Sequence, residues 1–169
     1  MSHLEFPNLS HKHSYLEMIG AWRESGEEII PSRIVGWEED FESFISLLEE
    51  ETTYNKNGVN SHLFFLVENG RILGAIQIRH HINHPNLIET GGHIGYGIRP
   101  SERGKWFGAQ MLALALQEAK KIGLEKVLIA CYDTNLWSRR VIEKNGGIFE
   151  RLVLQNGCKK RRYWITLNR

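Results

Sequence analysis

The sequence predicts a domain built from both helices and strands (α/β in the broad sense, α+β in the narrow one). Helices are expected on both faces of a mixed, mostly antiparallel central sheet of about seven strands. Short segments of alternating apolar residues joined by Asn-Gly turns are typical of antiparallel hairpins. One strand-helix-strand segment, residues 93–132, adds a parallel pair, because a helix crosses over between its strands. A length of 169 residues with 41% hydrophobic residues suits a single domain over residues 1–169.

The N-terminal third is expected to be mainly helical. From the N-terminus we expect a strand, a helix, a loop and a second helix, over residues 3–6, 14–23, 27–36 and 37–51. The first helix is predicted from a capping box formed by Ser14 and Glu17. The second has an apolar stripe at helical spacing that begins at Trp37, and an acidic outer face that we interpret as solvated.

The rest of the chain alternates between strand and helix patterns. Strands are expected at residues 62–67, 71–79, 93–98, 126–132, 148–154 and 160–167, with helices at 105–122 and 135–144. Asn69-Gly70 and Asn156-Gly157 mark two hairpin turns. Gly123 is expected to end the longer helix in a left-handed conformation.

The turn after the strand at 93–98 is typical of a phosphate-binding site. Arg103 and Lys105 place two cations in this turn, directly before a helix. Free backbone N–H groups and the positive end of the helix dipole favour a bound pyrophosphate there. Small residues let backbone and ligand approach closely, namely Gly104, Gly108 and Ala109.

Composition argues against several other classes of protein. The net charge is +1 with 24% charged residues, so we expect no nucleic-acid partner. The basic run at residues 159–162 is interpreted as a solvated edge. We expect no membrane segment and no metal site, because no long apolar run and no metal-ligand spacing occurs. Two cysteines fit a reducing compartment, and we expect a cytoplasmic protein.

The order of the elements and the turn at Arg103 resemble the GNAT superfamily of N-acetyltransferases. The family's pyrophosphate signature is Gln or Arg, two residues, Gly, one residue, and Gly or Ala. Arg103 opens it here and Gly108 closes it, whereas Trp106 replaces the middle glycine. Asn135 and Ser138 match a second family feature at the start of the following helix. Residues 91–103 and 143–147 look closest to a bacterial subgroup described only as predicted acetyltransferases.

This resemblance implies a V-shaped splay between the fourth and fifth strands, with acetyl-CoA, as co-substrate, in the wedge. Backbone groups near residues 96–98 would pair with the pantetheine arm, amides of residues 104–109 would hold the pyrophosphate, and Asn135 would bind the arm from the opposite side. The implied cofactor-binding residues are Tyr96, Gly97, Ile98, Arg103, Gly104, Lys105, Trp106, Phe107, Gly108, Ala109, Asn135 and Ser138.

The resemblance also implies direct acetyl transfer to a primary amine of a small molecule or protein. The family's usual glutamate base is missing, and His93 is the titratable substitute on that strand; its alternative is a structural hydrogen-bonding role, because a bulge is needed to turn it into the wedge. The usual tyrosine acid is replaced by Ile142. Tyr96, Tyr132 and Cys131 are candidate acids, each with a plain core role as its alternative.

These departures leave a catalytically silent CoA-binding module as the alternative function. We expect acetyl-CoA and an amine acceptor as partners, with a homodimer left open. Arg79, His80, His81 and His84 lie where an acceptor would enter, and we interpret them as a polar loop rather than as a site for a carboxylate or phosphate.

Overall fold

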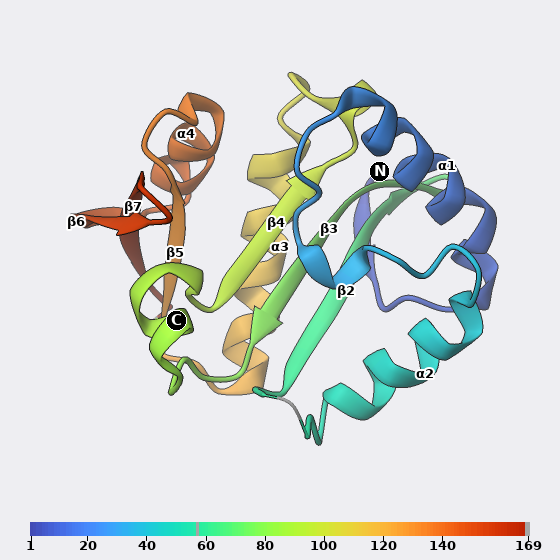
Figure 1. Cartoon of the computed structure of the whole chain (residues 1–169), viewed down its shortest axis with the longest axis horizontal. Helices are drawn as coiled ribbons and strands as arrows, with labels where there is room; N and C mark the ends of the chain where they lie inside the picture. The colour runs from blue at the N-terminus through green and yellow to red at the C-terminus, as the bar shows by residue number, and fades with distance from the viewer. Residues whose placement is uncertain (57, 168–169) are drawn as a thin grey trace.

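The structure, a computed structural model, describes residues 1–56 and 58–167. In this part of the chain seven strands form one sheet in the order β1-β2-β3-β4-β5-β7-β6 (Figure 1). The strands are β1 (His3–Glu5), β2 (Ser61–Glu68), β3 (Arg71–Arg79), β4 (Ile94–Ile98), β5 (Lys126–Tyr132), β6 (Ile148–Gln155) and β7 (Cys158–Thr166). The helices are α1 (Lys12–Ser25), α2 (Phe41–Glu51), α3 (Phe107–Ile122) and α4 (Leu136–Lys144). Short helical turns are η1 (Leu9–His11), η2 (Ser32–Ile34), η3 (Leu87–Gly91) and η4 (Pro100–Glu102).

The predicted mixed sheet is confirmed. β4 and β5 are parallel, and all other neighbouring strands are antiparallel. Asn69 and Gly70 have φ values of 52° and 76°, and Asn156 and Gly157 have 52° and 82°. A two-residue hairpin loop with positive φ at both positions matches the twist of its strands, and Asn-Gly adopts this conformation readily. The Asn-Gly pairs therefore predicted the positions of both hairpins correctly. The predicted single domain includes residues 57, 168 and 169, which lie outside the described residues.

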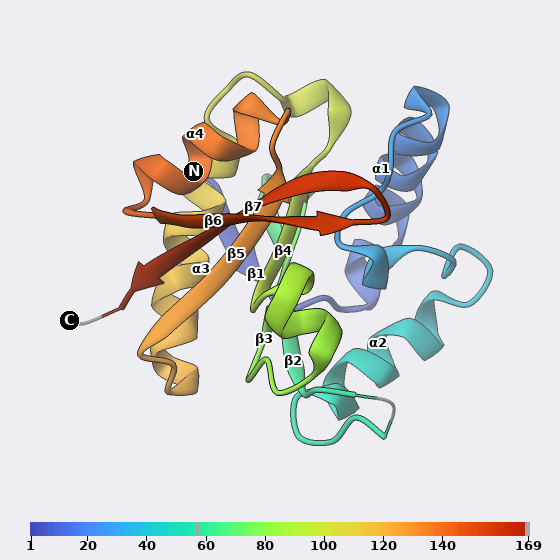
Figure 2. The same ribbon diagram turned by 60° about the vertical axis from the view of Figure 1, so that its left-hand side comes forward.

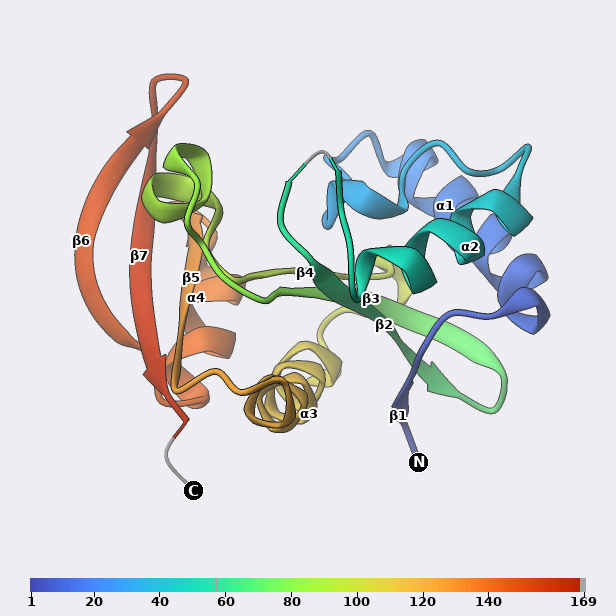
Figure 3. The same ribbon diagram turned by 90° about the horizontal axis from the view of Figure 1, so that it is seen from below.

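Helices cover both faces of the sheet, as predicted. α1 and α2 lie on one face, and α3 and α4 lie on the other (Figure 3). Each face has its own apolar cluster: one includes Trp22 and Phe65, and the other includes Met111 and Ile129. No helix in the described residues has the length and apolar character needed to cross a bilayer.

Two helix starts differ from the sequence prediction. α1 begins at Lys12, before Ser14, so the predicted capping box is wrong. A capping box formed by Asn8 and His11 is present instead at the preceding turn η1, so the helical segment begins before Ser14. The Ser14 hydroxyl accepts the amide N–H of Ile72 at 2.8 Å, so it joins α1 to β3 rather than capping the helix.

The second helix also starts later than predicted, at Phe41. Asp40 caps it by accepting the amide N–H of Ser43 at 3.2 Å. Trp37 lies outside the helix, and its ring stacks on Phe44 with a centroid separation of 5.5 Å. The apolar pattern therefore began at a residue that packs on the helix without belonging to it.

β4 and β5 part after a single point of contact. Their only paired residues in the described chain are Ile94 and Ile129. Beyond this point β4 continues along β3, and β5 continues along β7. The two strands diverge in Figure 1, which is the predicted splay between the fourth and fifth strands; Figure 2 shows the sheet with β6 and β7 turned forward. The facing backbone edges of residues 96–98 and 130–132 are thereby left without a strand partner in the described chain.

The connection between α1 and α2 crosses β4 at Gly97. A Cβ atom at this position would overlap the carbonyl oxygen of Ile30 and would lie 2.8 Å from a ring carbon of Trp22. Gly95, two residues earlier, has room: its Cβ would meet only Pro31, at 3.8 Å. A glycine at position 97 therefore lets the connection approach the strand.

We expect Gly97→Ala to lower the free energy of unfolding by about 1–3 kcal/mol, the usual cost of overpacking, because backbone must move to admit the methyl group. Gly95→Ala is the matched control and should change it by less than about 0.5 kcal/mol. Urea unfolding of both variants makes the comparison. Equal stabilities would contradict the close approach at Gly97.

Candidate active site

A cleft opens where β4 and β5 part. The part that more residues line, called the wider cavity below, has a volume of about 330 Å³ and lies between the two strands, bounded also by the α1–α2 connection, the start of α4 and the β6–β7 turn. A second hollow of about 350 Å³ shares Glu28, Tyr96 and Tyr132 with the first and extends to Arg103. The two hollows form one continuous cleft, and its far end reaches the predicted phosphate-binding turn.

The backbone of that turn is arranged as an anion site requires. Gly104 and Trp106 are both left-handed, with φ values of 77° and 66°. Alternation of left- and right-handed residues directs successive N–H groups into a concavity that suits an anion. Among the described residues, the amides of residues 104–109 donate no internal hydrogen bond. They lie at the N-terminus of α3 and remain free to bind a ligand.

The side chains of the turn are engaged with neighbours. The Arg103 guanidinium forms an ion pair with Glu27 and donates to the carbonyl oxygen of Ile98 at 3.1 Å. Lys105 pairs with Glu102 at 3.2 Å. Since Arg103 lines the cleft, an incoming phosphate would share this cation with Glu27.

Trp106 is exposed to 62% and therefore does not belong to the core. The Lys144 ammonium lies 5.1 Å from the centroid of its ring. The tryptophan that replaces the middle glycine of the family signature thus has its indole on the surface, and its backbone is left-handed. Phe107, which follows it, is half-buried and packs against the apolar cluster beneath α3.

Gly108 and Ala109 are buried at the first turn of α3. A Cβ at Gly108 would overlap the ring of Trp137 from α4. Its small size therefore serves the packing of α3 against α4, in addition to leaving the amide exposed. Trp137 also lines the cleft, so this contact sets the position of one cleft wall.

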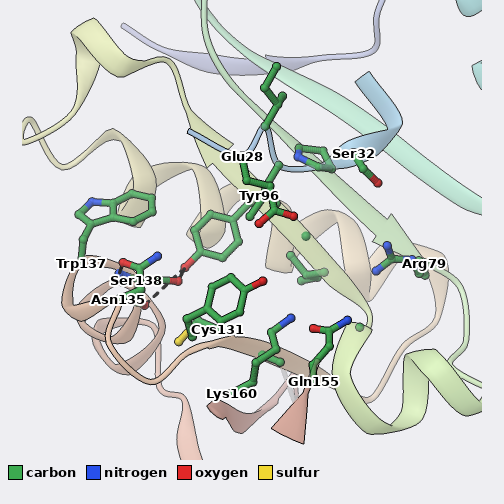
Figure 4. Close-up of a pocket in the computed structure, with 18 of the residues that line it drawn as sticks. Glu28, Ser32, Arg79, Tyr96, Cys131, Asn135, Trp137, Ser138, Gln155 and Lys160 are labelled. Carbon is green, nitrogen blue, oxygen red and sulfur yellow. Dashed lines mark hydrogen bonds between the residues drawn. The ribbon is translucent and has the colours of Figure 1, made fainter. Parts of the chain in front are cut away.

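Tyr96, Asn135 and Ser138 are brought together on one side of the cavity (Figure 4). The Asn135 side chain accepts the amide N–H of Ser138 at 3.0 Å and caps α4, as predicted. The Tyr96 hydroxyl lies 2.7 Å from the Ser138 hydroxyl. Burial raises the pKa of Tyr96 well above its usual value. Tyr96 therefore stays protonated and joins β4 to α4.

His93 lies at the joint between β4 and β5, outside the set of residues that line the cleft. Its backbone N–H donates to the carbonyl of Leu128 at 2.8 Å, and its Nδ1 accepts the amide N–H of Leu128 at 2.9 Å. Burial, with a smaller effect of the Arg79 charge, lowers the pKa of His93 to about 4. This geometry favours the structural hydrogen-bonding role over the role of a base.

Tyr132 lies at the end of β5 and lines both hollows. Burial, and to a smaller degree the Glu28 charge, raises the pKa of Tyr132, so the phenol is protonated at neutral pH. Cys131, the residue before it, also faces the wider cavity, and burial raises the pKa of its thiol. Of the candidate acids, Tyr132 combines position in the cleft with a side chain that is only half-buried.

Two functional candidates, Glu28 and Lys160, were not predicted from the sequence. Figure 4 shows Glu28 on one side of the cavity, and Lys160 and Gln155 on the opposite side. Glu28 is the only carboxylate that lines both hollows among the described residues. No local motif marks either residue, because a loop crossing and a hairpin turn bring them to the cleft.

Comparisons with known proteins agree with this architecture. A family model described as "Acetyltransferase (GNAT) domain" matches residues 12–148. A search of the curated proteins found no match.

Solved structures provide fold-level similarity at low identity. The microcin C7 self-immunity acetyltransferase MccE, solved with acetyl-CoA and AMP, is 19% identical, with a TM-score of 0.66 over 98% of this chain and 92% of that one. A Salmonella typhimurium acetyltransferase that modifies the N-terminal serine of ribosomal protein L7/L12 is 14% identical, with a TM-score of 0.71 over 99% and 95%. The spermidine/spermine N-acetyltransferase SpeG of Vibrio cholerae is 15% identical, with a TM-score of 0.64 over 99% and 95%.

The position of His93 predicts a specific pH dependence of stability. Its pKa is 6.5 in the unfolded reference and about 4 in the fold, so protonation favours unfolding. The contribution of neutral His93 to the free energy of unfolding is complete above pH 6.5. It is lost as the pH falls toward 4, and the loss amounts to up to about 3 kcal/mol. In His93→Gln the amide oxygen accepts the same N–H from Leu128 without titrating.

We therefore expect the unfolding free energy of the wild type to decrease more steeply between pH 7 and pH 4.5 than that of His93→Gln. Urea unfolding across this range measures both curves. His62 and His80, whose pKa values burial also lowers, are common to both proteins and cancel in the difference. Parallel curves would show that His93 does not titrate in this way.

Proposed function

The chain belongs to the GNAT acetyltransferase family, and we propose that it transfers the acetyl group of acetyl-CoA directly to a primary amine of a small molecule or protein. The observation that carries this proposal is the continuity of the cleft. It runs from Arg103, in the turn that leads into α3, along the open edge of β4, to a cavity lined by Glu28 and Tyr132. A long, jointed ligand with an anionic group near one end fits such a path.

In this proposal the protein binds acetyl-CoA mainly through its backbone. The amides of residues 104–109 and the Arg103 guanidinium hold the pyrophosphate at the positive end of the α3 dipole. The open β4 edge at residues 96–98 pairs with the pantetheine arm, because no strand of the described chain pairs with this edge. Asn135 contacts the arm from the α4 side. Main-chain contacts of this kind tolerate Trp106 in place of the usual glycine.

The amine must lose a proton before or during its attack. An amine with a pKa of about 10.4 is neutral in about one molecule in 2,500 at pH 7, a cost of about 4.6 kcal/mol. Glu28 is the carboxylate that faces the cavity, and we assign it the role of the base that accepts this proton. His93 keeps its structural role, since the amide of Leu128 occupies its Nδ1.

The thiolate of CoA takes up a proton as it leaves. We assign this acid role to Tyr132, because its raised pKa keeps the phenol protonated and its side chain lines both hollows. Tyr96 is assigned a positioning role through Ser138. In this scheme Glu28, on the connection between α1 and α2, acts on the amine, and Tyr132, at the end of β5, acts on the sulfur.

The alternative, a CoA-binding module without catalysis, differs in one observable. Purified protein with acetyl-CoA and a panel of primary amines should release free thiol, which a thiol reagent detects. Binding of CoA without thiol release, at every pH and with every amine, would favour the silent module.

We expect Arg103→Ala to weaken CoA binding about tenfold, because one charge-assisted contact to the pyrophosphate is lost. Binding of pantetheine, which lacks the pyrophosphate, should not change. Lys120→Ala removes one cation from the far end of α3 and is the matched control. Calorimetry measures both ligands, and an unchanged CoA affinity in Arg103→Ala would contradict this site.

We expect Glu28→Gln to reduce kcat by about 100-fold or more, within the range contributed by a positioned base, with little change in KM for acetyl-CoA. Glu24→Gln, an exposed carboxylate on α1, is the control and should retain the full rate. Steady-state thiol release at saturating amine measures both variants. Full activity of Glu28→Gln would rule out Glu28 as the base.

A further inference from the structure

Two cations face the cleft without a carboxylate partner. Arg79, at the end of β3, and Lys160, on β7, both line the wider cavity. Arg79 donates to the carbonyl of Gly92 at 3.0 Å, and Lys160 donates to the carbonyl of Thr90 at 3.3 Å. Within residues 1–56 and 58–167, neither side chain forms an ion pair.

The neighbours of Lys160 on the same strand behave differently. Arg161 pairs with Asp133 at 3.1 Å, and Arg162 pairs with Glu150 at 2.9 Å. The chain therefore supplies internal counterions next to this position but not at it. The lack of an ion pair therefore distinguishes the cations that line the wider cavity from Arg161 and Arg162 of the same hairpin.

The arrangement carries an energetic cost that a ligand can offset. Burial lowers the pKa of Arg79. Burial also lowers the pKa of Lys160, Glu28 opposes that effect, and the charge of Arg79 adds to it. Like charges placed together in a partly desolvated cavity destabilise each other. An anion between them would offset this repulsion and form hydrogen bonds in which both donor and acceptor are charged.

We propose that Arg79 and Lys160 bind an anionic group, a carboxylate or a phosphate, that the acceptor amine carries close to its nitrogen. This inference rests on the proposed function, because it places the acceptor in the wider cavity. Glu28, on the opposite side in Figure 4, faces the ammonium end of the same molecule. The cavity is thus dipolar, with one carboxylate across from two cations.

This charge arrangement defines a class of acceptor. A zwitterionic amine, such as an amino acid or an aminoalkyl phosphate, satisfies both sides of the cavity at once. A polyamine satisfies Glu28 but adds further positive charge beside Arg79 and Lys160. An uncharged alkylamine leaves both cations unpaired. The prediction that Arg79 belongs to a polar loop is wrong, because Arg79 is the last residue of β3 and lines the cavity, whereas His81 and His84 do not line it.

The test compares amines that differ by the anionic group alone. β-Alanine is paired with propylamine, and phosphoethanolamine with ethanolamine; putrescine represents polyamines. Thiol release is measured for the wild type, for Lys160→Met and for the control Lys159→Met. Lys159 is an exposed residue of the same hairpin, so its replacement removes one charge and leaves the strand unchanged. Calorimetry of β-alanine and phosphoethanolamine with the CoA-bound protein provides a second readout that needs no turnover.

We expect the anionic amine of at least one pair to have the higher kcat/KM. We also expect Lys160→Met to raise its KM about tenfold or more, the loss of a charge-assisted contact, with Lys159→Met close to the wild type. The pair that shows this effect distinguishes a carboxylate from a phosphate. Equal use of the neutral or cationic amines, unaffected by Lys160→Met, would overturn the anion site while leaving acetyl transfer intact.

Absence of thiol release with every amine would instead contradict the proposed function. In that case calorimetry decides the anion site: binding of an anionic amine that Lys160→Met abolishes supports it. No binding of either anionic amine would overturn it.

Discussion

The cleft depends on one constraint, the single pairing of Ile94 with Ile129 that joins β4 to β5. His93 reinforces this joint, because its backbone and its ring both bond to Leu128. Beyond the joint each strand is held by its other neighbour, β3 or β7, so neither can close the gap. A pair of parallel strands that is fixed at one end and diverges at the other leaves two backbone edges facing a wedge. An extended ligand can occupy that wedge as an additional strand.

Two glycines on either side of the Ile94 pairing determine what approaches β4. Gly92 has a φ value of 68°, and a Cβ there would lie 3.1 Å from the carbonyl carbon of Leu128, so a larger residue would push β5 away. Gly97 admits the connection between α1 and α2, and with it Glu28. Close approach explains this glycine-rich segment better than a bulge, because β4 keeps a regular register with β3. The same backbone contacts that fix the fold therefore place a carboxylate at the site.

Local chemistry determined which features could be predicted from the sequence. The Asn-Gly turns, the left-handed Gly123 and the Asn135 cap each depend on a few adjacent residues, and all were predicted. The free amides at the start of α3 follow from the same kind of local pattern. Glu28 and Lys160 reach the cleft through tertiary packing, which no short motif encodes. The error at Ser14 has the same origin, because its hydroxyl bonds to β3 across the fold.

The distribution of charge in the cleft argues for an ordered arrangement of two substrates. At the far end, Arg103 is paired with Glu27 and can share its charge with a phosphate. In the wider cavity, Arg79 and Lys160 form no ion pair with a carboxylate of the described chain, and we propose that they bind the anion of the acceptor. A net charge of +1 over the whole chain conceals this pattern. With the pyrophosphate at Arg103 and the anion of the acceptor at Arg79 and Lys160, as proposed, the thioester and the amine would meet between these two sites, beside Glu28. In this proposal the positions of the counterions, rather than their number, orient the acceptor toward the acetyl group.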